Sequence, residues 1–145
     1  MKGKARDNSD RERLYLLDTT ALMTFIENEK GADEVEKILR EAYINRARVL
    51  ASFMSIMEGY HSILKEGNEE SARDFYLYMK VLPVEIVGID ERITIKAGDI
   101  KASLGLTTAQ SWIVASAMGY KAILVHKEPS YEVLSSLLPM ITLPY

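Results

Sequence analysis

Short continuous runs of apolar residues alternate with segments of helical periodicity from residue 14 to the C-terminus. Leu14–Leu17 and Lys121–Val125 lack the polar alternation of a half-exposed strand, which is typical of strands buried on both faces of a sheet. The same pattern predicts further strands at Val49–Ala51, Val84–Val87 and Ile141–Leu143.

Helical spacing fills the segments between these runs. An apolar stripe with i, i+3, i+4, i+7 and i+8 spacing predicts an amphipathic helix over Ala32–Arg46. Ser52 is a good N-cap for a second such helix, from Phe53 to Leu64. Its stripe consists of Phe53, Ile56, Met57, Tyr60 and Leu64. Further helices are predicted over Thr20–Glu29, Glu69–Lys80 and Thr107–Met118, with a short one from Pro129. Asp90 can cap another helix, which extends to about Leu104.

The strand–helix–strand order indicates an α/β fold. Continuous apolar strands favour a mostly parallel sheet, roughly five-stranded here, covered by helices on both faces. There is no internal repeat and no second domain boundary in the sequence. Residues 14–145 are therefore predicted to form a single domain, preceded by a flexible charged tail over residues 1–13.

Composition narrows the class of protein. The chain has 145 residues, 48% hydrophobic and 27% charged, which is typical of a soluble globular domain. No apolar run reaches the roughly 18–20 residues of a membrane span, and residues 1–13 lack the apolar core of a signal peptide. The absence of cysteine excludes disulfides, thiol catalysis and thiolate metal sites. These features favour a cytoplasmic location, with no membrane partner.

Charge is distributed unevenly along the chain. The net charge is −3, so no overall basic field steers nucleic acid to the protein. Residues 1–13 nevertheless carry five bases and three acids. A solvated tail is the favoured interpretation of this segment, and a basic arm that contacts phosphates is the alternative.

Several catalytic motifs are absent from the sequence. It has no phosphate-binding P-loop, no dinucleotide-binding glycine motif and no nucleophile elbow. Its two histidines, His61 and His126, are too few for a histidine-rich metal centre. Glu58 and His61 have the i, i+3 spacing of di-iron bundles, but such bundles need two pairs of this kind.

Two acids follow apolar runs that are predicted to be strands. Asp18 comes directly after Leu14–Leu17, and Glu128 follows Lys121–Val125 by a few residues. Ligands bind beyond the carboxyl ends of the strands in open α/β sheets, so these acids are expected to meet there. Glu58 and Gln110 lie on helices that can reach the same edge. Such oxygen ligands suit Mg²⁺ or Mn²⁺.

Each of these residues also has a structural explanation. Asp18 suits a helix N-cap, and Glu128 precedes Pro129 at an N-cap position that glutamate fills poorly. Glu58 can be a solvated helix acid that pairs in part with His61. Thr107 and Gln110 have the T-x-x-Q spacing of a capping box, so Gln110 can serve the helix alone.

Together, these segments resemble the PIN-domain family, and in particular the VapC-type nuclease toxins. The similarity lies in Leu16–Leu22, Ala51–Glu58 and, above all, the stretch from Ala97 to Tyr131. It implies a three-layer α/β/α sandwich and a Mg²⁺- or Mn²⁺-dependent ribonuclease that forms a homodimer and is blocked by an antitoxin protein.

The resemblance also assigns residues to a site. Asp18, Glu58 and Glu128 match acidic positions that hold the metal, and Thr20 matches a hydroxyl position beside it. Gln110 stands where the family has an aspartate, which makes a two-metal site doubtful. Glu128 itself replaces the more usual aspartate, and His126 replaces a small hydroxyl residue.

Three hypotheses follow. The first is a metal-dependent ribonuclease, the toxin of a toxin–antitoxin pair, in which Gln110 binds a metal-bound water or acts only as a cap. The second is a catalytically attenuated or inactive PIN-like domain that binds RNA or a protein. The third is an α/β interaction module without a metal site.

Overall fold

The structure of the protein is a computed structural model, and it describes residues 13–145. The predicted charged tail and its alternative as a basic arm fall on residues 1–12, outside the described part of the chain. Arg13, which the sequence placed in the tail, is the first residue of strand β1.

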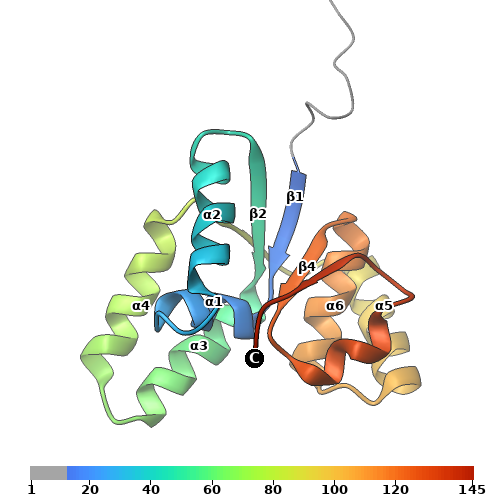
Figure 1. The fold of residues 1–145 in the computed structure, drawn as a ribbon. Helices are drawn as coiled ribbons and strands as arrows, with labels where there is room; N and C mark the ends of the chain where they lie inside the picture. Colours follow the sequence, from blue (N-terminus) through green and yellow to red (C-terminus); the bar gives the residue numbers. More distant parts are fainter. Residues whose placement is uncertain (1–12) are drawn as a thin grey trace, which may run out of the picture.

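All neighbouring strands of the central sheet are parallel, in the order β3-β2-β1-β4-β5 (Figure 1). Leu17 at the end of β1 lies between Ala51 of β2 and Val125 of β4. The carboxyl ends of these strands therefore share one edge of the sheet, as predicted. The strands are β1 (Arg13–Leu17), β2 (Ala47–Ser52), β3 (Glu85–Val87), β4 (Ile123–His126) and β5 (Met140–Thr142).

Helices cover both faces of this sheet (Figure 1). They are α1 (Thr19–Ile26), α2 (Ala32–Tyr43), α3 (Phe53–Lys65), α4 (Glu69–Val81), α5 (Glu91–Leu104) and α6 (Thr108–Tyr120), followed by the 3₁₀ helix η2 (Pro129–Leu134). Side chains alternate along β1 because successive residues of a strand point to opposite faces. Tyr15 and Leu17 pack with α1, α2 and α4, whereas Leu16 packs with α5, α6 and η2. The three-layer α/β/α fold is confirmed.

Some predicted boundaries were wrong by a few residues. The last strand before Glu128 begins at Ile123 rather than Lys121, because Lys121 adopts a left-handed conformation (φ 56°) that ends α6. The helix expected over Ala32–Arg46 stops at Tyr43, shortly before the left-handed Asn45.

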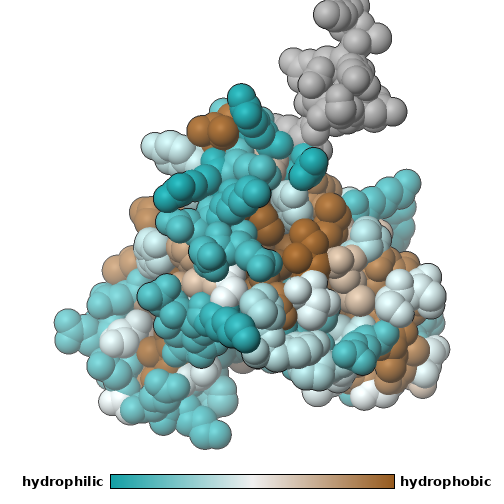
Figure 2. Space-filling view, viewed as in Figure 1, coloured by the Kyte–Doolittle hydropathy of each residue, from teal (hydrophilic) through white to brown (hydrophobic). Residues whose placement is uncertain are grey.

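Hydrophilic residues cover the outer face of α2, and hydrophobic residues gather near the strands between α2 and α6 (Figure 2).

The apolar stripe predicted for α3 is only partly covered. The buried residues of helix α3 are Ser55 and Gly59, which lie outside the stripe. Met57 and Leu64 of the stripe are 53% and 41% exposed. This stripe instead lines a groove of about 920 Å³ between α3 and α4, which we call the α3–α4 groove. The groove is lined by Phe53, Ile56, Met57, Tyr60, His61, Leu64, Tyr76, Met79, Lys80, Val84 and Ile86.

Gly59 permits the close packing of α3 against α4. A Cβ atom at this position would lie 2.5 Å from Cζ of the buried Phe75 and 3.2 Å from Sδ of Met23. We expect Gly59→Ala to lower the free energy of unfolding by about 1–2 kcal/mol, because overpacking outweighs the gain in helix propensity. Gly98→Ala in α5 is the matched control, since an added Cβ meets nothing within 4 Å there.

The control variant should raise the free energy of unfolding by about 0.5–1 kcal/mol, through helix propensity alone. Urea denaturation of both variants measures the two changes. Equal stabilisation of the protein by the two substitutions would contradict the packing argument.

Within residues 13–145, no helix combines the length and the apolar character needed to cross a membrane.

Candidate active site

A pocket of about 340 Å³ contains all the candidate site residues predicted from the sequence. It lies beyond the carboxyl ends of β1 and β4, where the backbone N–H of Asp18 donates to the carbonyl of Val125 at 3.0 Å. We call it the acidic pocket. Its lining consists of Asp18, Thr19, Thr20, Glu58, His61, Thr107, Gln110, Ile113, Glu128 and Tyr131.

Asp18 is the most deeply buried acid of the pocket, with 2% of its surface exposed. It is the N-cap of α1, and its Oδ1 accepts hydrogen bonds from the backbone N–H of Ala21 at 2.9 Å and the hydroxyl of Thr20 at 2.6 Å. Burial raises the pKa of this carboxyl to about 7, against the effect of hydrogen bonds from Thr20 and Ala21, and the charge of Glu128 raises it further. No cationic side chain within residues 13–145 pairs with it.

Thr20 connects the two strand ends that carry the acids. Its hydroxyl donates to Asp18 and accepts from the backbone N–H of Lys127 at 2.8 Å. The segment after β4 is thereby joined to the start of α1. This contact gives Thr20 a geometry that suits the predicted supporting position.

Glu58 reaches the pocket from α3 and is held there by Thr19 rather than by His61. The Thr19 hydroxyl lies 2.5 Å from Glu58 Oε1 and 2.9 Å from the Ser55 hydroxyl. Because Thr19 has one hydroxyl proton, it donates to Glu58 and accepts from Ser55. Sequence reasoning missed Thr19, although its place beside Asp18 was an available signal.

Glu128 is the N-cap of η2, as its position before Pro129 predicts. Its Oε2 accepts from the backbone N–H of Ser130 at 3.1 Å and from the Ser130 hydroxyl at 2.9 Å. Its own backbone N–H donates to Nδ1 of the buried His126 at 3.0 Å. Nε2 of that ring therefore carries the proton and faces the Thr142 hydroxyl at 3.1 Å.

Two aromatic rings close the pocket behind Glu128. Tyr131 is 1% exposed and packs edge-on against His126, with 5.1 Å between ring centroids. Burial lowers the pKa of His126, against the charge of Glu128, which agrees with an Nδ1 that accepts a hydrogen bond. Burial and then the nearby acids raise the pKa of Tyr131, which stays a phenol. Nothing in its sequence context distinguished Tyr131 from a core residue.

Gln110 forms the capping box that the sequence predicts. Its backbone N–H donates to the Thr107 hydroxyl at 3.1 Å, and its Oε1 accepts from the Thr107 backbone N–H at 3.0 Å. Its Nε2 lies 3.4 Å from the Ser130 hydroxyl. The residue thus caps α6 and also faces the acidic pocket.

The three acids are each held by the protein through at least one carboxylate oxygen. Glu58 Oε2 and Glu128 Oε1 have no hydrogen-bond donor among residues 13–145. The side chains of the three acids do not form a ready three-acid metal cluster in this part of the chain. The all-oxygen donor set and the uncompensated, buried Asp18 nevertheless fit a hard divalent cation such as Mg²⁺ or Mn²⁺.

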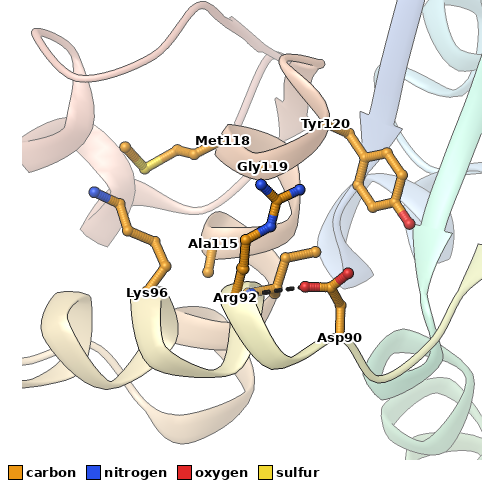
Figure 3. A pocket seen from close by; sticks show the side chains of 8 residues that line it. Asp90, Arg92, Lys96, Ala115, Met118, Gly119 and Tyr120 are labelled. Carbon is orange, nitrogen blue, oxygen red and sulfur yellow. Dashed lines mark hydrogen bonds between the residues drawn. The ribbon is translucent and has the colours of Figure 1, made fainter.

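Another cavity, of about 450 Å³, lies between α5 and α6 (Figure 3). Its charged lining consists of Asp90, Arg92 and Lys96, and the Asp90 carboxylate already caps α5 through the backbone N–H of Ile93. Gly119 and Tyr120 line it at the end of α6 opposite to Gln110. This cavity is therefore separate from the acidic pocket.

The sequence matches a known protein family, and the fold is similar to that of solved structures. The family model described as PIN domain matches residues 15–134. No match was found among curated proteins.

The fold is similar to that of several solved structures, at 20% sequence identity or less in the following three cases. VapBC2 from Rickettsia felis, bound to a DNA fragment from its promoter, has a TM-score of 0.72 at 14% identity, over 90% of this chain and 99% of that chain. VapBC-1 from nontypeable Haemophilus influenzae has a TM-score of 0.67 at 20% identity, over 89% and 97%. PAE2754 from Pyrobaculum aerophilum has a TM-score of 0.65 at 17% identity, over 90% and 89%.

Proposed function

Because the chain belongs to the PIN-domain family, whose members are nucleases, we propose that it is a metal-dependent ribonuclease and the toxin of a toxin–antitoxin pair. The observation that carries the proposal is the acidic pocket. Asp18, Glu58 and Glu128 line one cavity, and Glu58 and Glu128 each keep one carboxylate oxygen without a protein donor among the described residues. Asp18 is also buried without a cation partner there.

In this proposal the three acids hold Mg²⁺ or Mn²⁺, and hydroxyl groups of the chain orient them. Bound there, such an ion would lower the pKa of a water and neutralise charge on an RNA phosphodiester. Thr20 orients Asp18, Thr19 orients Glu58, and Ser130 orients Glu128. Gln110 supplies no charge, which supports a single ion rather than a pair.

The direct test is cleavage of a labelled RNA by the purified full chain. We expect cleavage with Mn²⁺ or Mg²⁺ and none with EDTA, because the acids alone provide no activated water. Gln110→Asp, assayed beside the wild type, separates the two leading functions. Cleavage by the wild type supports the nuclease, and cleavage by Gln110→Asp alone supports an attenuated domain. Equal cleavage with EDTA and with metal would indicate a contaminating nuclease and overturn the proposal.

The second candidate function is an inactive RNA- or protein-binding module, and Gln110 is the observation that favours it. A neutral amide replaces the acid that the family has at this position, so the pocket has one negative charge fewer. This function predicts RNA binding that persists in EDTA, without cleavage. Electrophoretic mobility shifts with and without Mn²⁺ measure that difference.

Protein partners are part of the proposal. The α3–α4 groove is mostly apolar, with His61 and Lys80 as its basic side chains, and similar structures include VapBC toxin–antitoxin complexes. These features support an antitoxin partner and a homodimer. The cytoplasmic location favoured by the sequence is part of the same proposal. Sedimentation of the chain alone tests the homodimer, and a monomer at every concentration would contradict it.

A further inference from the structure

A hydrogen-bonded bridge joins α6 to the last acid of the acidic pocket. Gln110 Nε2 lies 3.4 Å from the Ser130 hydroxyl, which donates to Glu128 Oε2 at 2.9 Å. The Ser130 backbone N–H reaches the same oxygen at 3.1 Å. Position 110 is therefore connected to Glu128 through one intervening side chain, although the two are 18 positions apart in the sequence.

The amide of Gln110 can form this bridge, whereas a carboxylate at position 110 cannot. Gln110 Oε1 accepts from the backbone of Thr107, and its Nε2 donates to Ser130. An ionised carboxylate only accepts hydrogen bonds, so aspartate or glutamate there could not donate to the Ser130 oxygen. It would also add a second negative charge near Glu128. The capping box fixes the amide plane, which directs the donor away from the helix end.

Glu128 needs such support because its side chain has one more rotatable bond than aspartate and more rotamer freedom to lose. The backbone of Glu128 is already fixed by His126, whose ring is held by Thr142 and packed against Tyr131. Ser130 and Gln110 add a restraint on the carboxylate itself. Oε2 is thereby held, while Oε1 has no donor among the described residues.

We propose that Gln110 and Ser130 are positioning residues that hold the Glu128 carboxylate for metal binding. This inference rests on the proposed metal-dependent function and extends it to two residues outside the set of acidic ligands. It also gives a role to Gln110, which stands where the family has an acid. The amide carries no charge, but it restrains the side chain of Glu128, which is longer than that of aspartate.

The test is a double-mutant cycle on Mn²⁺ affinity of the full chain, with Ser130→Ala, Gln110→Met and the double variant. We expect each single variant to weaken Mn²⁺ binding roughly 10-fold, the lower end of the effect of residues that orient metal ligands. The double variant should be no weaker than the weaker single variant, because both changes break one bridge. Free Mn²⁺ is measured by its electron paramagnetic resonance signal.

Two control variants separate the bridge from general effects on stability. Ser135→Ala removes an exposed hydroxyl from the same segment and should leave the Mn²⁺ affinity unchanged. Thr107→Val weakens the cap of α6 and should lower the melting temperature, but Ser130→Ala should still weaken Mn²⁺ binding in that background. Unchanged affinity in both single variants, or multiplicative losses in the double variant, would overturn the inference.

A metal-free measurement distinguishes failure of this inference from failure of the proposed function. If the wild type does not bind Mn²⁺, the metal site and its positioning role fail together. The side-chain amide resonances of Gln110 then report whether the bridge itself exists. They should shift in Ser130→Ala and stay in place in Ser135→Ala. Unshifted resonances in Ser130→Ala would show that the bridge does not form.

Discussion

Asp18→Asn is expected to abolish metal-dependent RNA cleavage, with a loss in kcat/KM of at least about 100-fold. Replacing groups that only orient a metal ligand costs roughly 10–100-fold, and Asp18 is proposed as a ligand itself. The variant replaces a carboxylate with an amide of the same shape. Asparagine caps helices as well as aspartate does, so α1 should keep its N-cap. The substitution therefore tests the charge rather than the fold.

A matched control uses the same chemical change at an exposed site. Asp99→Asn lies on the solvent side of α5, away from the acidic pocket, and should cleave RNA at the wild-type rate. Mn²⁺ affinity should fall in Asp18→Asn and stay constant in Asp99→Asn. If Asp18→Asn still cleaves RNA at the wild-type rate, Asp18 is only a helix cap and the proposed site is wrong.

The metal-free protein is expected to lose stability as the pH rises from about 4 to about 7. Burial raises the pKa of Asp18 from 3.8 to about 7, so in this window the folded protein binds a proton that the unfolded chain releases. A raised acid pKa contributes stability at low pH that is lost as the pH rises through the folded value. The shift corresponds to about 4 kcal/mol at most.

Asp18→Asn isolates this contribution from those of the other groups. His126 acts in the opposite direction, because burial lowers its pKa and the folded protein gains stability as the pH rises toward 6.5. The wild type and Asp18→Asn both contain His126. The difference between their free energies of unfolding therefore measures the contribution of Asp18. Urea denaturation in EDTA at pH 4, 5.5 and 7 measures it. Parallel pH profiles for the two proteins would contradict the burial of an ionisable Asp18.

Addition of Mn²⁺ should offset much of the loss at pH 7. A ligand that binds only the folded state stabilises it by RT ln(1 + [L]/Kd), about 2.7 kcal/mol at 100 times Kd. The same addition should leave Asp18→Asn almost unchanged.

Local features of the fold were predictable because they depend on neighbours in the sequence. The Ser52 and Asp90 caps and the Thr107–Gln110 capping box all involve residues two or three positions apart. Continuous apolar runs predicted the central strands because a strand buried on both faces tolerates no polar alternation. The burial of α3 was not predictable in this way. The approach of α4 at Gly59 decides it, and the predicted stripe was left on a groove.

The candidate site also combines features that the local sequence predicts with contacts that depend on tertiary packing. The sequence supplied Asp18, Thr20, Glu58, Gln110 and Glu128 and the edge at which they meet, because parallel strands end on one side of their sheet. It did not supply Thr19 as the partner of Glu58, or Ser130 as the link between Gln110 and Glu128. Thr19 and Glu58 are 39 positions apart, and Gln110 and Ser130 are 20 apart, so neither contact is visible in the local sequence. Ser130 and Glu128 are only two positions apart, but a serine hydroxyl can bond to many nearby groups.

By itself, the sequence determined the order of strands and helices, the helix caps and the acids at the strand ends, since each follows from residues that are close along the chain. The tertiary structure alone decided which oxygen of each acid is held, which helix face is buried and what the amide of Gln110 contacts. Hydrogen bonds require atoms within about 3 Å, and only the packing of α1, α3, α6 and η2 around one sheet edge brings these side chains so close.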